Sequence, residues 1–396
     1  MPGPLDGIRV IDLTMNVLGP MATQVLGDYG ADVLKIEQPG GDPMRKIGPC
    51  RTADMGSYFL NLNRNKRSVM LDLKRAPARA ALLRLIAGAD VFIHNIRTTA
   101  AARLGLDYAS LSTLNPRLIY GSGTGFRKGG PLRDAPAFDD VMQGQCGLAV
   151  LNRGPDGAPR YVPTVIADKF CGHTLASAVG MALFHRERTG QGQEVHVPML
   201  ETMLAFTLIE HLWGASIGEP EQGLEYPRMM SPHRRPYATK DGFICLLAVT
   251  DEQWRRLFAA IDRPGLIDDP RFATLRDRGH NIDAVYDVVA QAMPHRTTAE
   301  WQARLTAADL PNGPANTVQD LVDDQYLAET GFFSTHEHPV EGRLTMMAVP
   351  VEFSASPTQL RSLPAKLGAD TEAVLAEAGL SQGEIEAAMG QPAHAA

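Results

Sequence analysis

The sequence predicts an α/β fold, with a large domain built on a mostly parallel sheet and a second, smaller α+β domain. Over residues 1–125, short apolar runs alternate with segments of helical periodicity, which is the pattern of repeated strand–helix–strand units. The chain has 396 residues, and a single hydrophobic core rarely grows beyond about 250–300 residues. We therefore expect two domains, and we expect ligands of the large domain at the carboxyl ends of its strands.

The elements of the large domain each have a local signal. Short apolar runs predict the buried strands, and the first helix opens at Pro20 and is followed by Gly30, residue types favoured at a helix start and a helix end. The predicted strands are Ile8–Leu13, Asp32–Glu37, Ser68–Leu73, Asp90–His94 and Arg117–Tyr120, and the glycine-rich segment Gly121–Phe126 follows the last of them. The predicted helices are Pro20–Asp28 and Ala78–Ala87.

The second half of the chain predicts one long helix and then a change of domain. The long helix runs from Asp168 to Arg188 and ends at Gly190, and a Gly-, Pro-, Met- and Arg-rich stretch at 217–236 leads into the second domain. Further strands are expected at Gln193–Met199 and Phe243–Ala248, and further helices at Leu200–Trp213, Glu252–Ile261, Asn281–Met293, Ala299–Ala308 and Gln382–Met389. We assign 1–200 to the large domain, completed by 340–396, and 225–325 to the small domain, with linkers at about 201–224 and 326–339.

Composition and charge exclude several classes of function. The net charge of −7 and the pI near 5.9 argue against a general nucleic-acid binder, which needs excess positive charge. The four cysteines form no C-x-x-C pair, a pattern that favours reduced thiols in the cytoplasm. The first residues lack the pattern of a signal peptide, and no apolar run is long enough to span a membrane. We expect a cytoplasmic protein without nucleic-acid or membrane partners.

Common cofactor and metal motifs are missing. The residues after Leu13 contain no dinucleotide fingerprint, and the chain has neither a phosphate-binding G-x-x-x-x-G-K-[ST] loop nor a G-x-S-x-G nucleophile turn. The strongest metal-like signal is His336-Glu337-His338, but two imidazoles in a polar loop are more often solvated. We therefore expect no metal and no prosthetic group.

Many short segments, all in register, resemble the family III coenzyme A transferases of the formyl-CoA and carnitine-CoA transferase type, also called the CaiB/BaiF family. The segments span Ile8 to Leu200, about half of the chain, and their order and spacing make the resemblance specific. They include Gly19-Pro20, Gly30-Ala31-Asp32-Val33-Leu34-Lys35-Ile36-Glu37, Asn63-Arg64-Asn65-Lys66-Arg67-Ser68, Asn95-Ile96-Arg97, Arg103-Leu104-Gly105, Ala167-Asp168 and Thr189-Gly190-Gln191-Gly192-Gln193. The resemblance implies a Rossmann-like large domain and an interlocked homodimer.

The resemblance also implies that Asp168 is a catalytic nucleophile. An ionised carboxylate can attack an acyl-CoA thioester, which gives an aspartyl-acyl anhydride and then an aspartyl-CoA thioester. Backbone N–H groups of Gly121–Gly125 are candidates to stabilise the oxyanion. By local pattern alone Asp168 is a helix N-cap, because it precedes a long helix. The two roles are compatible, since a helix N-terminus favours the ionised carboxylate.

Coenzyme A would enter as the thioester substrate and contact residues that follow the strands. By resemblance, the contacts are Val17, Leu18, Gln38, Leu71, Leu73, Lys74, Asn95, Ile96, Arg97, Arg103, Phe138 and Asp139. Each cation has an alternative as a solvated surface charge, and each aliphatic side chain an alternative as core packing. Val17 and Gln38 differ from the residues usual at these positions in the family, so the residues that contact the adenine of coenzyme A are not assigned. Residues 229–235 stand where formyl-CoA members of the family have a glycine-rich run. Arg234 or Arg235 is a candidate to bind the carboxylate of the acceptor acid. The alternative is that both arginines belong to a solvated linker.

Three functions remain to be compared. The first is transfer of coenzyme A from an acyl-CoA to a free carboxylic acid, with a dicarboxylate such as succinate as the expected acceptor. The second is an α-methylacyl-CoA racemase, which pairs the aspartate with a histidine for proton transfer; at the corresponding position this chain has Phe138. The third is an acyl-CoA-binding relative without catalysis, because a shared fold never proves activity. The missing histidine favours the transferase.

Overall fold

The computed structural model describes residues 2–390, and the chain divides into two compact units. Unit 1 contains residues 1–152, 159–206 and 329–396, and unit 2 contains 153–158 and 207–328. The stretch expected as the first linker holds most of helix α9 (Met199–His211) and two short 3₁₀ turns. The stretch expected as the second linker holds most of α16 (Gln325–Glu329) and all of β10 (Phe333–His338).

Unit 1 is built on a six-stranded, fully parallel sheet with the order β3-β2-β1-β4-β5-β6. This is the order of a doubly wound Rossmann-type sheet, so the α/β prediction is confirmed. The strands are β1 (Arg9–Leu13), β2 (Asp32–Glu37), β3 (Lys66–Met70), β4 (Val91–His94), β5 (Ile119–Thr124) and β6 (Gln193–Pro198). The order reverses between β1 and β4, where Val10 pairs with Val91 and Leu13 with His94.

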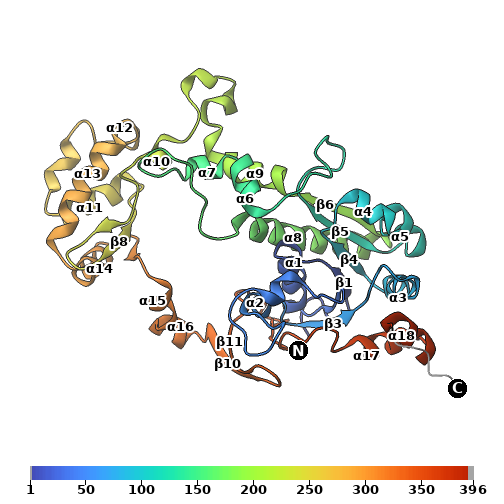
Figure 1. The fold of residues 1–396 in the computed structure, drawn as a ribbon. Helices are drawn as coiled ribbons and strands as arrows, with labels where there is room; N and C mark the ends of the chain where they lie inside the picture. The colour runs from blue at the N-terminus through green and yellow to red at the C-terminus, as the bar shows by residue number, and fades with distance from the viewer. Residues whose placement is uncertain (1, 391–396) are drawn as a thin grey trace. The chain divides into compact units, whose positions relative to one another are not determined.

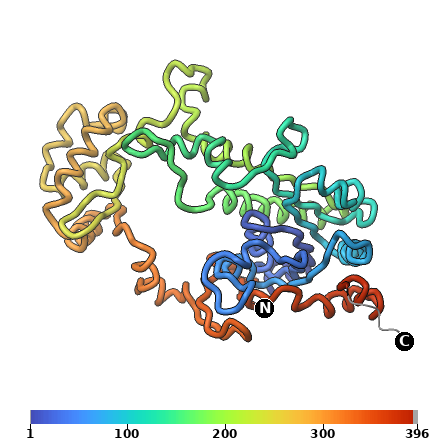
Figure 2. The backbone as a smooth tube through the Cα atoms, in the orientation of Figure 1, coloured from blue at the N-terminus to red at the C-terminus, as the bar shows by residue number. Residues whose placement is uncertain are grey.

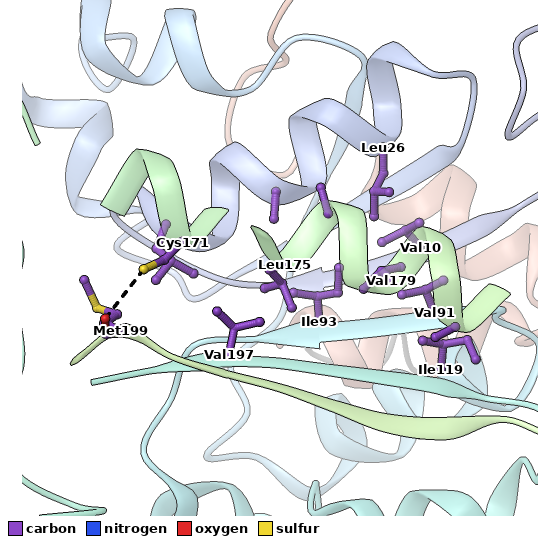
Figure 3. Close-up of a cluster of buried hydrophobic side chains, with 14 of the residues drawn as sticks. Val10, Leu26, Val91, Ile93, Ile119, Cys171, Leu175, Val179, Val197 and Met199 are labelled. Carbon is purple, nitrogen blue, oxygen red and sulfur yellow. Dashed lines mark hydrogen bonds between the residues drawn. The ribbon is translucent and has the colours of Figure 1, made fainter. Parts of the chain in front are cut away.

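Helices cover both faces of this sheet (Figure 1). On one face α1 (Leu18–Asp28) and α8 (Ile166–Thr189) bury a core in which Val10, Val91, Ile93 and Ile119 meet Leu175 and Val179 of α8 (Figure 3). On the other face a second core joins Ile11, Leu34 and Phe92 to three helices. These are α3 (Ala76–Ala87), α17 (Thr371–Glu377) and α18 (Gln382–Met389).

Strand β5 extends further than its apolar run predicted, because the glycine-rich segment continues it to Thr124. Added Cβ atoms explain why glycine is needed here. At Gly121 a Cβ would crowd Ile93, and at Gly123 it would overlap Leu18. Helix α1 thus lies so close to β5 that a side chain at Gly123 would force the end of the Leu18 side chain to move.

The remaining short elements of unit 1 lie in the connections between its strands. They are η1 (Pro43–Lys46), α2 (Ser57–Leu62), α4 (Thr98–Arg103), α5 (Tyr108–Leu114), α6 (Asp139–Gln145) and α7 (Leu148–Leu151). Helix α4 follows β4 directly, and α6 lies against the start of α8 through hydrogen bonds described below.

The C-terminal segment returns to unit 1 and lies beside its first 70 residues, as the red and blue parts of Figure 2 show. Its hairpin joins β10 to β11 (Gly342–Met347). Beyond the hairpin, the Ser68 N–H donates to Asp370 at 2.8 Å and the Met70 N–H donates to Thr371 Oγ1 at 2.9 Å. Both donors belong to β3, so the segment covers the outer side of an edge strand.

Unit 2 combines helices with a three-stranded antiparallel sheet of the order β7-β8-β9. Its core holds Trp254, Phe258, Val285, Val289 and Trp301. The helices are α10 (Pro227–Met230), α11 (Asp251–Ala260), α12 (Leu275–His280), α13 (Ile282–Ala292), α14 (Thr298–Ala307) and α15 (Val318–Val322). The strands are β7 (Tyr237–Ala238), β8 (Phe243–Leu246) and β9 (Asn312–Pro314).

The histidine pair of β10 has structural partners. His338 is buried, its Nε2 lies 2.9 Å from the Pro364 carbonyl, and its Nδ1 accepts from the N–H groups of Val340 and Glu341. Within residues 2–390, no three His, Cys, Asp or Glu side chains are grouped to hold a metal ion. Nor does any helix of that part of the chain have the length and apolar character to cross a bilayer.

Candidate active site

The ligand edge of unit 1 is centred where the strand order reverses, between β1 and β4. The loop after β1 contains Thr14, Met15 and Asn16, and the loop after β4 contains Asn95 and Ile96. In open parallel sheets, ligands bind in the crevice at this switch point, because the two loops diverge there. Two cavities meet at this point, since Met15 and Ile96 line both of them.

The loop after β1 is held in a fixed conformation by polar contacts. Asn95 binds Met15 twice, accepting from its N–H at 3.1 Å and donating to its carbonyl at 2.7 Å. Asn16 has a left-handed backbone with φ of 65°, and its N–H donates to Asp42. Asp42 in turn forms a buried ion pair with Lys35 at 2.9 Å, and Lys35 donates to the Thr14 carbonyl.

The first cavity, of about 370 Å³, contains the predicted nucleophile Asp168. Leu18 and Phe138 contribute apolar walls, and Asn95, Arg97 and Arg133 contribute polar groups. Gly123, Thr124 and Gly125 also line this cavity, so the expected glycine segment lies at the same site as Asp168. A carboxylate, two arginines and a glycine segment thus surround one small space.

Asp168 itself occupies the third position of helix α8, and Val165 is the N-cap residue. The predicted N-cap role of Asp168 is therefore wrong. The cap comes from Asp139 on α6, whose Oδ1 accepts from the N–H groups of Ala167 at 2.7 Å and of Asp168 at 3.1 Å. Sequence patterns reveal only local caps, and Asp139 lies 29 residues before Asp168.

This arrangement has a direct electrostatic consequence for Asp168. Burial raises the pKa of its carboxyl to about 7, and the nearby carboxylate of Asp139 adds to the rise. The expectation that the helix N-terminus favours the charged form of Asp168 is thus wrong, because Asp139 takes the free N–H groups. Near pH 7 the carboxyl is divided between its acidic and ionised forms, a state typical of a reactive group.

The second cavity, of about 300 Å³, lies between the ends of β1, β2 and β3. Its walls are mostly aliphatic, with Leu71, Leu73 and Leu104 among them, and Lys74 and Arg79 contribute positive charge. Gln38 also lines it. An apolar slot with cations beside it suits a ring system that carries phosphates.

The structure brings most of the predicted site residues to the two cavities. Leu18, Asn95, Arg97, Phe138 and Asp168 line the first, Gln38, Leu71, Leu73 and Lys74 line the second, and Ile96 lines both. The other three line neither cavity: Val17 is buried at the start of α1, Arg103 is exposed at the end of α4, and Asp139 is buried as a cap.

Sequence reasoning missed Thr14, Met15, Asn16, Arg79 and Arg133. The first three were detectable, because they directly follow the first predicted strand. Arg79 and Arg133 had no local signal.

The racemase alternative needs a histidine next to Asp168. None of the residues that line the Asp168 cavity is a histidine, and Phe138 occupies the expected position with its side chain largely exposed. Proton transfer between two bases therefore has no second base at this cavity.

The sequence profile of CoA-transferase family III matches residues 5–371. The chain belongs to CoA-transferase family III. The predicted family and the predicted enzyme class, a CoA-transferase, are thereby confirmed. The profile spans both units, so membership does not rest on the large domain alone.

Two named enzymes are similar to this chain over most of its length. Succinate–glutarate CoA-transferase of Agrobacterium fabrum is 35% identical over 389 residues, which cover 94% of this chain and 95% of the relative. Acetyl-CoA:oxalate CoA-transferase of Acetobacter aceti is 37% identical, with 81% of this chain and 83% of the relative covered.

Solved structures of CoA-transferase family III relatives agree with this fold. A mutant of Rv3272 from Mycobacterium tuberculosis superimposes with a TM-score of 0.82 at 32% identity, covering 94% of this chain and 98% of the other. A CaiB/BaiF family protein from Brucella suis gives 0.80 at 30% identity, covering 96% and 100%.

Proposed function

We propose that this family III enzyme transfers coenzyme A from an acyl-CoA thioester to a free dicarboxylic acid, with Asp168 as the covalent carrier. The observation that carries the proposal is the position of Asp168 in a cavity at the switch point, beside a second cavity with apolar walls and cations. The names of relatives that act on succinate, glutarate and L-malate support a dicarboxylate as the acid.

The reaction balances without a cofactor. The Asp168 carboxylate attacks the thioester carbonyl, the C–S bond breaks, and coenzyme A leaves as the thiolate from a mixed anhydride. The thiolate then attacks the Asp168 carbonyl, which releases the first acid and leaves an aspartyl-CoA thioester. The acceptor carboxylate displaces the thiolate from Asp168, and the thiolate attacks the acceptor carbonyl of the new anhydride. The new acyl-CoA leaves, and the Asp168 carboxylate is restored.

The two cavities divide the substrate between them in this proposal. The nucleotide part of coenzyme A occupies the second cavity, where Lys74 and Arg79 meet its phosphates. The thioester reaches Asp168 past Met15 and Ile96, which line both cavities. Arg97 and Arg133 are placed to bind the free carboxylate of a dicarboxylate, and backbone N–H groups of the glycine segment are candidates for the oxyanion.

A homodimer belongs to the same proposal. Helix α8 exposes Met181 by 67% and Phe184 by 59%, three positions apart and therefore on one side of the helix. Large apolar side chains exposed together favour a protein partner. Light scattering of the purified chain should give twice the mass of 42.9 kDa. A monomer at micromolar concentration would contradict this part.

The covalent step is tested by trapping. Incubation with succinyl-CoA followed by hydroxylamine should modify one peptide, the one that contains Asp168, as detected by mass spectrometry. Asp168→Asn should lose the modification and reduce transfer by at least about 1,000-fold, because no other step replaces the nucleophile. Asp140→Asn is the matched control, since Asp140 is an exposed carboxylate of α6. Label on any other peptide would contradict the mechanism.

A further inference from the structure

Unit 2 contains a cavity of its own, of about 270 Å³, and it is lined in part by Arg234 and Arg235, the two residues that the sequence offers as candidates to bind a carboxylate. Three arginines line it: Arg228 from α10, and Arg234 and Arg235 from the segment that leads to β7. Its other walls come from β7, β8, α11 and α13. They contain Tyr237, Cys245, Leu246, Leu247, Ala248, Trp254 and Tyr286.

The three guanidinium groups lack carboxylate partners within the described part of the chain. Arg228 donates through Nε to the Tyr286 hydroxyl at 2.8 Å, and neither Arg234 nor Arg235 has a side-chain hydrogen bond or ion pair. Several other arginines of this unit are paired, as Arg278 is with Asp251 and Arg256 with Asp309. Arg234 and Arg235 are exposed, so water screens part of the repulsion among the three charges, and an anion that enters the cavity removes the rest.

The cavity is held in shape by helix α13. Ser231 is buried, and its hydroxyl donates to Asp283 at 2.5 Å and accepts from the His233 N–H at 3.2 Å. Tyr286, one turn further along α13, holds Arg228. The segment with the arginines is thus anchored to α13 at Arg228 and at Ser231, which contributes to the preorganisation that a binding site requires.

Size and wall chemistry define the ligand. A cavity of about 270 Å³ lies just below the range of about 300–1,000 Å³ typical of ligand pockets, so the ligand is small. Guanidinium groups bind carboxylates with two parallel hydrogen bonds, and three of them match more than one negative charge. Leu246, Ala248 and Trp254 offer apolar surface for a short methylene chain.

We propose that unit 2 binds a small aliphatic dicarboxylate in this cavity, through Arg228, Arg234 and Arg235. The site is complete within unit 2 and does not require the chemistry at Asp168. Its failure in an experiment would therefore leave the proposed transfer mechanism intact, and loss of the covalent label at Asp168 would leave this site intact.

Cys245 reports occupancy of the site directly, because it is exposed and lines the cavity. The full chain, without coenzyme A, is treated with iodoacetamide, and alkylation of each cysteine peptide is followed by mass spectrometry. Glutarate should slow alkylation of Cys245 by several-fold in a saturable manner. Cys50 is the internal control, since it is also exposed and lies in unit 1.

Arginine variants then test which groups bind the acid. Arg228→Ala and Arg235→Ala should each raise the glutarate concentration for half-protection by about tenfold or more, since each removes charged hydrogen bonds. Arg276→Ala is the matched control, because Arg276 is exposed in unit 2 and does not line the cavity. Glutaramide, the neutral diamide, should not protect.

Three outcomes would overturn the proposal. One is a rate of Cys245 alkylation that does not respond to glutarate. Another is protection that survives both arginine substitutions unchanged. The third is equal protection by inorganic phosphate, which would show a general anion site with no preference for a dicarboxylate.

Discussion

Asp168 and Asp139 are coupled through two backbone N–H groups at the start of α8. The Oδ1 atom of Asp139 accepts from the N–H groups of Ala167 and Asp168, so its negative charge stays close to the Asp168 carboxyl. Burial and this charge raise the pKa of Asp168 to about 7. The neutral acid is thus favoured in an empty site, and the nucleophilic form predominates only above neutral pH.

The raised pKa makes stability depend on pH in a definite direction. Between about pH 4 and 7 the folded state holds a proton that the unfolded state releases, so the Asp168 contribution falls as pH rises and is lost above about pH 7. Asparagine does not ionise, so Asp168→Asn removes the free-energy cost of an ionised carboxylate in the folded state. We expect the variant to exceed the wild type by roughly 1–3 kcal/mol at pH 8 and to match it near pH 3.5, below the ordinary pKa of the unfolded carboxyl.

Urea unfolding at the two pH values measures this difference. Asp140→Asn serves as the control and should differ from the wild type by less than about 0.5 kcal/mol at both. An Asp168→Asn variant no more stable than the wild type at pH 8 would show that the carboxylate is not disfavoured in the folded protein.

At the scale of elements, the approach of α1 to β5 shapes the Asp168 cavity. A Cβ at Gly123 would overlap Leu18 of α1, and both residues line the cavity. The glycine is required by helix–strand packing, and the same packing brings the backbone of β5 to the surface of the site.

Gly123→Ala tests this packing. Overpacking of this kind costs about 1–3 kcal/mol of unfolding free energy, and the shifted α1 should also lower transfer activity. Gly144→Ala is the control, because a Cβ at Gly144 of α6 meets nothing within 4 Å. Leu18→Ala combined with Gly123→Ala should recover part of the lost stability, measured by urea unfolding. If the double variant loses as much unfolding free energy as the two single variants together, Leu18 is not the residue that a Cβ at position 123 overlaps.

The elements also show where prediction from sequence succeeded and where it failed. Strand β2 (Asp32–Glu37) was predicted to the residue because Val33, Leu34 and Ile36 mark it as a buried strand, although Lys35 interrupts them. Strand β3 was expected two or three residues too late, since Lys66 is buried in an ion pair with Asp12 and breaks the apolar pattern. The second half of β5 was missed, because its glycines have no side chains to mark a face.

The site residues, too, were predicted where a local pattern marks them and missed where it does not. Residues after predicted strands, such as Asn95 and Ile96, were found by their position in the chain. The cap of α8 and the arginine at 133 depend on how segments meet in space, and no local pattern carries that information.

At the scale of the whole molecule, Asn65 joins the beginning of unit 1 to its C-terminal segment. Its side chain donates to Asp28 and to the Gln359 carbonyl, and accepts from the N–H groups of Arg361 and Ser362. Asn65 also has a left-handed backbone with φ of 60°, a conformation that asparagine tolerates better than alanine.

Asn65→Ala should therefore destabilise unit 1 by roughly 2–4 kcal/mol. Hydrogen exchange should show faster exchange at residues 359–371 than elsewhere in unit 1, because the lost bonds hold that segment. Asn152→Ala is the control, since Asn152 is exposed and its amide makes one bond, to the Arg160 carbonyl. Unchanged exchange at 359–371 would show that Asn65 does not hold the segment.

The cover of β3 has a consequence for how the protein is made. The N–H groups of Ser68 and Met70 form hydrogen bonds with Asp370 and Thr371. These two residues leave the ribosome about 300 residues later than their donors. At synthesis rates of about 5–20 residues per second, that interval lasts at least about 15 seconds. During that time β3 is an open sheet edge on a nascent chain, so chaperone binding and misassembly with neighbouring chains on the same messenger should concentrate at residues 66–70.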